Sequence, residues 1–160
     1  MKEVIYRPIG VIHSPFKDIS GAPIQSAGGR GVKGRIDVES VYAGGLRDLD
    51  GFSHIILIYH FHLSRGFSLE VRPFMDENLR GVFSTRAPNR PNPIGLSIVR
   101  LTKVEGPVLY IEDLDIVDGT PLLDIKPYVP EFDVRKPERR GWLTEKASGV
   151  YGVKADERFK

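Results

Sequence analysis

A proline-rich stretch, residues 81–97 with the sequence GVFSTRAPNRPNPIGLS, constrains the local structure of this chain more than any other segment. Three prolines, Pro88, Pro91 and Pro93, lie within six residues of it. Each proline fixes its own φ at about −65° and favours extended geometry in the residue before it. We therefore expect a stiff loop, which loses little conformational entropy when it holds a ligand. Apolar, strand-like residues on both sides of it indicate a loop between two strands.

Two arginines, Arg86 and Arg90, stand in this loop. A guanidinium group is planar and permanently charged, and it suits a carboxylate, a phosphate or the edge of a base. The loop is therefore a candidate binding site. A turn with solvated arginines explains the same residues equally well, because loops carry function often but not always.

The chain has 160 residues, and we expect one domain over residues 1–160. It has no cysteine, which excludes disulfides, thiolate metal sites and a cysteine nucleophile, and which fits a reducing, cytoplasmic compartment. No apolar run approaches the roughly 20 residues of a membrane span, and the N-terminus lacks the apolar core of a signal peptide. We therefore expect no association with a membrane.

The net charge is only +2, but the basic residues are unevenly distributed. Between residues 78 and 104 there is no Asp or Glu, and a second basic run lies near the C-terminus. The basic residues in question are Arg80, Arg86, Arg90, Arg100 and Lys103 in the first segment, and Arg135, Lys136, Arg139 and Arg140 in the second. Clustered positive charge suits a phosphate backbone, although a solvated surface explains it equally well.

Strand-like segments outnumber helical ones in this sequence. We expect strands at about 5–13, 35–38, 52–63, 96–104, 108–114 and 122–128, and one short helix within 39–50. No alternation of strands and helices appears, so the pattern predicts an all-β or β-dominated barrel or sandwich. The formal GxGxxG at residues 29–34 is not a dinucleotide site, because a loop precedes it and a strand follows it.

Three histidines, His54, His60 and His62, would point to the same face of the predicted strand at 52–63. No acidic residue lies close to them in the sequence, and the chain has no thiols. Catalytic zinc usually takes three protein ligands with a recognisable spacing. We therefore expect no metal site here.

The string TRAPNRPNPIGLS, residues 85–97, resembles the signature of the TrmO (YaeB, TsaA-like) family of S-adenosylmethionine-dependent tRNA methyltransferases. The resemblance covers about residues 5–128 and leaves 129–160 as a C-terminal extension. It implies a small β-barrel that is neither the Rossmann nor the knotted methyltransferase fold. It also implies a homodimer.

The resemblance further implies a set of residues that contact S-adenosyl-L-methionine. They come from separate parts of the chain, so they converge only if their loops meet at one end of the barrel. These residues are Pro23, Ile24, Gln25, His62, Leu63, Arg86, Leu96, Ile116, Val117, Asp118 and Gly119.

The reaction implied by the resemblance is methylation of the exocyclic nitrogen of N-threonylcarbamoyl-adenosine beside the anticodon of a tRNA. That nitrogen is carbamoylated, so a base that takes its proton would help, and Asp118 is the first candidate and His62 the second. The basic residues Arg80, Arg90, Arg100, Lys103, Arg135, Lys136, Arg139 and Arg140 would then face tRNA phosphates.

Two alternatives remain open at this point. One is a β-barrel that binds RNA without a catalytic step, and it would have no use for S-adenosylmethionine. The other is a methyltransferase whose acceptor is a small molecule or a protein. Activity on tRNA should weaken steeply as salt rises, whereas activity on a small molecule should not.

Overall fold

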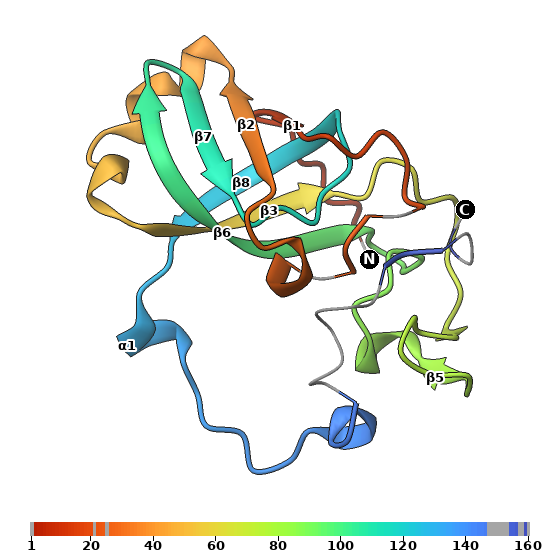
Figure 1. The fold of residues 1–160 in the computed structure, drawn as a ribbon. Coiled ribbons are helices and arrows are strands. Elements are labelled where there is room, and N and C mark those ends of the chain that lie inside the picture. Colours follow the sequence, from red (N-terminus) through yellow and green to blue (C-terminus); the bar gives the residue numbers. More distant parts are fainter. Residues whose placement is uncertain (1, 21, 25, 147–153, 157–158, 160) are drawn as a thin grey trace.

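A computed structural model describes residues 2–20, 22–24, 26–146, 154–156 and 159 of the chain. Its centre is a closed barrel with the strand order β1-β2-β7-β6-β3-β8 (Figure 1). Every neighbouring pair is antiparallel. The strands are β1 (Gly10–His13), β2 (Lys33–Val38), β3 (His54–His60), β6 (Ile94–Glu105), β7 (Val108–Glu112) and β8 (Thr120–Pro127).

Closure of the barrel depends on β1, which pairs with β2 on one side and β8 on the other. A closed barrel has no exposed strand edge, so its backbone groups are paired all round. The prediction of a β-dominated barrel is confirmed. The strand expected at 5–13 starts only at Gly10, because Pro8 has no N–H to give to a neighbouring strand. Val4, Ile5 and Tyr6 are exposed.

Alternation of side chains along β3 and β6 builds the core. Along β3 the inward residues Ile55, Leu57 and Tyr59 are buried, while their neighbours are partly exposed. Along β6 the same period buries Ser97 and Val99. The interior is completed by residues of the other strands and of the segment after β7, namely Ile12, Ile36, Leu109, Ile111, Leu114, Ile116 and Leu122. Each such aliphatic side chain contributes about 1.5–3 kcal/mol when it is fully buried.

The helices in the described residues are short. The helix expected within 39–50 is two 3₁₀ helices, η2 (Ser40–Leu46) and η3 (Leu49–Gly51). Asp48 lies between them with a φ of 66°, which ends the helical path. Another 3₁₀ helix, η1 (Ser26–Gly29), leads through a turn into β2, so the glycines at 29–34 do not join a strand to a helix. This context differs from the strand, loop and helix that a dinucleotide motif needs.

A second, smaller core lies beside the barrel. The segment at 64–81 contains a two-stranded sheet of β4 (Glu70–Val71) and β5 (Arg80–Gly81), and η4 (Val82–Ser84) follows it. Its buried residues are Val71, Val82, Ala87 and Phe159, with Phe74 packed edge-to-face on Phe159. This core supports the start of the proline-rich loop.

The segment after β8 leaves the barrel through α1 (Pro130–Asp133) and returns to the small sheet at η5 (Gly141–Leu143), as Figure 1 shows. Trp142 donates its indole N–H to the carbonyl of Ser84 at 2.9 Å. The buried carboxylate of Asp76 pairs with Arg80 at 2.7 Å and with Lys146 at 2.8 Å. These contacts attach the C-terminal segment to the residues that precede the proline-rich loop. That residues 1–160 form a single domain stays a prediction.

Candidate functional site

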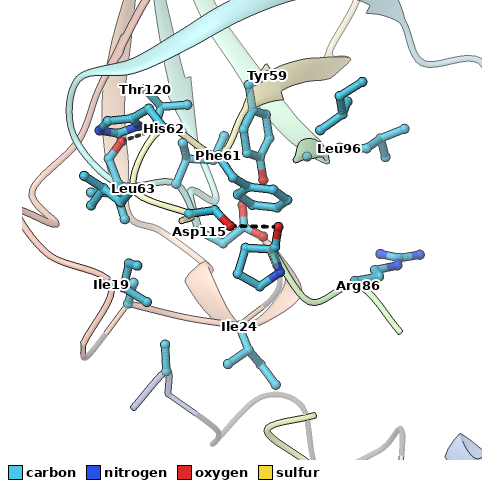
Figure 2. Close-up of a pocket in the computed structure, with 18 of the residues that line it drawn as sticks. Ile19, Ile24, Tyr59, Phe61, His62, Leu63, Arg86, Leu96, Asp115 and Thr120 are labelled. Carbon is cyan, nitrogen blue, oxygen red and sulfur yellow. Dashed lines mark hydrogen bonds between the residues drawn. The ribbon is translucent and has the colours of Figure 1, made fainter. Parts of the chain in front are cut away.

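A pocket of about 430 Å³ opens at one end of the barrel. The ends of β1, β3 and β7 and the starts of β6 and β8 meet there, because neighbouring strands of the barrel run in opposite directions. The loop after β1 and the proline-rich loop complete the wall (Figure 2). Its walls are mostly apolar, with Ile19, Ile24, Phe61, Leu63, Leu96 and Ile116 among the lining residues.

Most of the predicted cofactor residues line this one pocket. They come from four separate parts of the chain: the loop after β1, the end of β3, the proline-rich loop with the start of β6, and the segment before β8. The residues brought together in this way are Pro23, Ile24, His62, Leu63, Arg86, Leu96, Ile116 and Val117. Gln25 lies outside the described residues. Asp118 and Gly119 are not among the lining residues.

A hydrogen-bonded chain of three side chains forms part of the wall, and the sequence analysis missed it. Ser97 donates its hydroxyl proton to Asp115 at 2.7 Å, and the Tyr59 hydroxyl lies 3.0 Å from the Ser97 oxygen. A serine hydroxyl has one proton, so Tyr59 is the donor in its bond to Ser97. Burial, and next the negative charge of Asp115, raise the pKa of Tyr59 well above its usual value, so the phenol stays protonated. The one signal in the sequence is that Tyr59 and Ser97 are polar groups at inward positions of their strands.

His62 stands at the end of β3, on the side of the pocket opposite Arg86 in Figure 2. Its Nδ1 lies 3.3 Å from the hydroxyl of Thr120, which donates its own proton to the carbonyl of Val117 at 2.7 Å. His62 must therefore carry its proton on Nδ1, which leaves Nε2 with a lone pair. Burial, and next the nearby His60, lower the pKa of His62, so its ring is neutral at pH 7.

Comparison with known proteins agrees with this geometry. A family model described as the tRNA-methyltransferase O N-terminal domain matches residues 11–134. The chain belongs to the TrmO family. The resemblance carried by residues 85–97 is thereby confirmed.

Two curated relatives illustrate the range of the match. A probable S-adenosyl-L-methionine-binding protein of Pyrococcus abyssi is 53% identical over 156 residues, which is 98% of this chain and 85% of that protein. The tRNA (adenine(37)-N6)-methyltransferase of Escherichia coli is 39% identical over 140 residues, which is 81% of this chain and 60% of that protein. The chain thus matches only part of the bacterial enzyme's length.

A solved structure shows the same fold. The crystal structure of TrmO from Pseudomonas aeruginosa matches with a TM-score of 0.73 and 35% identity, over 89% of this chain and 63% of that one. The barrel of this TrmO-family chain is therefore the family's barrel.

Asp118, the first candidate for a base in the TrmO-like reaction, is already engaged outside the pocket lining. Its carboxylate pairs with Lys17 at 2.7 Å, accepts the backbone N–H of Ser14 at 3.1 Å, and lies 3.4 Å from Nδ1 of His13. The bond from Lys17, and next that from Ser14, lower the pKa of Asp118 to about 2. A carboxylate held in this way is a weak base. Its geometry indicates that it fixes the loop that carries Ile19 to the pocket.

Among the residues predicted to contact RNA, Arg90 alone lines the pocket. Its guanidinium donates to the carbonyls of Thr85 and Ala87, both at 3.3 Å, so it also holds the shape of the proline-rich loop. Arg80 is paired with Asp76 and lies 5.7 Å from the centre of the Trp142 ring.

The other predicted RNA contacts lie away from the pocket. Lys103 on β6 pairs with Glu105 at 2.9 Å. It is seven residues beyond Leu96 on the same strand, roughly 20 Å from the pocket at the rise of a β-strand. Arg100 is exposed on β6, and the remaining four are exposed on the segment between α1 and η5, namely Arg135, Lys136, Arg139 and Arg140.

The described residues contain no group of three or more His, Cys, Asp or Glu side chains placed to hold a metal ion. His54 and His60, considered above with His62, lie on β3 outside the pocket lining. Within the same part of the chain, no helix has the length and apolar character needed to cross a membrane.

Proposed function

We propose that this TrmO-family protein transfers a methyl group from S-adenosyl-L-methionine to the exocyclic nitrogen of threonylcarbamoyl-adenosine beside the anticodon of a tRNA. The names of its relatives support a tRNA adenine-N6 methyltransferase that uses this cofactor. The observation that carries the proposal is the convergence of cofactor residues from four separate segments on one pocket. Because the proposed substrate is tRNA, we place the protein in the cytoplasm.

The residues of the pocket fit this cofactor. A volume of about 430 Å³ lies in the range of small-molecule sites, about 300–1,000 Å³. Ile24, Leu63 and Leu96 offer apolar surface for an adenine ring, and the Arg86 guanidinium is suited to the cofactor's carboxylate. We infer that Pro23, Gln25, His62, Ile116, Val117, Asp118 and Gly119 complete the site, with Asp118 and Gly119 acting by holding the loops in place.

When bound, S-adenosyl-L-methionine supplies a methyl group that is already activated for transfer. The contribution of the chain is then to align the acceptor and to exclude water, for which the apolar walls are suited. Of the two bases expected from the sequence, His62 lines the pocket with a neutral ring, whereas Asp118 is bound to Lys17. His62 is therefore the stronger candidate of this pair.

The tRNA, in this proposal, approaches the open end of the pocket. Arg90 is at the pocket itself, and the exposed segment with Arg135, Lys136, Arg139 and Arg140 leads to η5 beside the small sheet. Arg80 is paired with Asp76 and Lys103 with Glu105, while Arg100 and Lys103 lie away from the pocket along β6. In this proposal these three residues contact only phosphates of the tRNA stem. Positive charge of this kind supplies affinity that falls as salt rises.

A homodimer is the assembly we propose. On the outer face of β3 and β6, Ile56 faces Ile98 and Ile58 faces Leu96 across the pair. Leu96 is 53% exposed and Ile98 37% exposed, although both stand on the outside of the barrel, where polar residues are the rule. A second copy with the same apolar face would cover it by two-fold symmetry. Leu96 also lines the pocket, so the partner would sit beside the cofactor site.

The test is a methyl-transfer assay with three tRNAs that differ at the adenosine beside the anticodon: threonylcarbamoyl-adenosine, plain adenosine, and the already methylated product. We expect methylation of the first alone, with a rate that falls steeply as salt rises. S-adenosylhomocysteine binding without methylation of any tRNA would indicate another acceptor. Failure to bind S-adenosylhomocysteine, with or without tRNA, would leave an RNA-binding barrel as the better account.

A further inference from the structure

We propose that Asp115 is a catalytic residue of this site, whose carboxylate takes the proton that the acceptor nitrogen loses during methyl transfer. The inference rests on the proposed function and assigns to Asp115 the role for which His62 and Asp118 were the candidates above.

Among the described residues that line the pocket, Asp115 alone has a carboxylate side chain. It follows β7 and lies directly before Ile116 and Val117, two of the proposed cofactor residues. In Figure 2 it lies between Arg86 on one side and His62 on the other. Asp115 therefore shares the pocket wall with residues proposed to hold the cofactor.

A hydrogen bond from Ser97 fixes the orientation of the Asp115 carboxylate. Ser97 is 2% exposed and donates to Oδ1 of Asp115, while Tyr59, 5% exposed, donates to Ser97. The hydroxyl protons of Tyr59 and Ser97 therefore both point toward the Asp115 carboxylate. The hydroxyl of Ser97 thereby holds the Asp115 carboxylate in one orientation, as a base in a pre-organised site must be held. Tyr59 itself is not the base, because its raised pKa keeps the phenol protonated.

The acceptor explains why a carboxylate is useful here. The nitrogen of threonylcarbamoyl-adenosine shares its lone pair with a carbonyl and a purine ring, so it gains nucleophilicity only as its proton leaves. In the step, the N–H bond breaks as the new N–CH₃ bond forms, and the proton passes to the Asp115 carboxylate. The electron pair of the broken S–CH₃ bond leaves with the cofactor's sulfur. One proton is gained by Asp115 and is later released to water.

The experiment compares Asp115→Asn with wild type, using S-adenosylhomocysteine affinity and single-turnover methylation of tRNA that carries threonylcarbamoyl-adenosine. Asparagine has the same shape and still accepts the Ser97 proton, so we expect an affinity within about threefold of wild type. The rate should fall by roughly 10²–10⁴, the usual contribution of a general base. Asp113→Asn is the matched control. Asp113 lies outside the pocket lining, accepts the N–H of Gly31, and has a φ of 68° that asparagine tolerates.

A pH profile separates a catalytic role from a structural one. Ser97→Ala removes the donor to Asp115, so the carboxylate is less stabilised and the acidic limb of the rate should move to higher pH. The other titratable or charged groups of the lining are Tyr59, His62, Arg86 and Arg90, and all four remain in this variant. A merely structural defect would lower the rate by the same factor at every pH. That result would contradict the role of Asp115 as the base that Ser97 supports.

Different results would overturn the proposed function and the role of Asp115. If wild type binds S-adenosylhomocysteine but does not methylate this tRNA, the proposed function is overturned, and the role of Asp115 with it. If wild type is active and Asp115→Asn is equally active, only the assignment of Asp115 fails. If Asp115→Asn loses cofactor affinity and rate in proportion, Asp115 is a cofactor ligand and not the base.

Discussion

The ring of Tyr59 lies directly against the backbone of Gly95, its partner in the pair of β3 and β6. A β-carbon at residue 95 would overlap three carbons of this ring. Tyr59 also packs edge-to-face on Phe61, with ring centroids 5.4 Å apart, and its hydroxyl reaches Ser97. The glycine in the string NPIGLS therefore has a physical reason, which is to leave room for the ring that starts the hydrogen-bonded chain to Asp115.

The first prediction follows from this contact. Gly95→Ala should push the Tyr59 ring out of place, lower stability by about 1–3 kcal/mol, as overpacked cores do, and weaken S-adenosylhomocysteine binding. Denaturant unfolding and a binding titration measure the two effects. Gly81→Ala is the control. Gly81 has open space around its α-carbon and a φ of −57°, so alanine there should change stability little. Equal stability of the two variants would show that the ring moves freely.

The sequence could predict a β-dominated fold because its apolar strands are separated by turns, and the resemblance at residues 85–97 narrowed a barrel or sandwich to a barrel. It could not predict the chain of Tyr59, Ser97 and Asp115, because these residues come from β3, β6 and the segment after β7, and only closure of the barrel brings them together. Asp118 was likewise chosen as the first candidate base from the acceptor's chemistry, and only the structure shows that Lys17, 101 residues earlier, holds its carboxylate. Local periodicity carries no information about such contacts.

The second prediction concerns the attachment of the C-terminal segment. Asp76→Asn removes the anion shared by Arg80 and Lys146, which should lower the melting temperature and expose residues 142–146 to proteolysis. Ala155 lines the pocket, so cofactor affinity should fall as well. Asp124→Asn, which breaks a more exposed pair with Lys126, is the control and should leave both properties nearly unchanged. A segment that stays protected in Asp76→Asn would mean that Trp142 holds it alone.

The third prediction is the effect of acid on the loop after β1. The folded pKa of Asp118 is about 2, below the value of about 3.9 for an unfolded chain. A lowered folded pKa stabilises the protein above the unfolded pKa, and that stability is lost as pH falls from about 4 to about 2. Unfolding free energies measured between pH 5 and 2 should therefore fall less steeply in Asp118→Asn than in wild type. Parallel curves would mean that Lys17 and Ser14 do not hold this carboxylate in solution.

The fourth prediction concerns the protonation of His62. Its lowered pKa predicts a titration midpoint below 6.5, followed through the imidazole protons by nuclear magnetic resonance. Thr120→Val keeps the shape of the side chain but removes the hydroxyl beside Nδ1. The ring should then lose its preference for a proton on Nδ1, which the nitrogen chemical shifts would report. A midpoint above 6.5 in wild type would contradict the neutral ring described here.

The last prediction addresses the cofactor site through Arg86. A hydrogen bond to a charged group contributes about 1.5–3 kcal/mol, so Arg86→Ala should weaken S-adenosylhomocysteine binding by roughly 10- to 150-fold. Thermal unfolding with and without the ligand measures this directly, because a ligand present at about 100 times its dissociation constant stabilises the folded state by about 2.7 kcal/mol. Arg47→Ala is the control, since Arg47 is exposed beside η2 and does not line the pocket. If Arg86→Ala keeps the full stabilisation by S-adenosylhomocysteine, the carboxylate of the cofactor does not bind the proline-rich loop through Arg86. The role of Arg86 would then be to contact the tRNA.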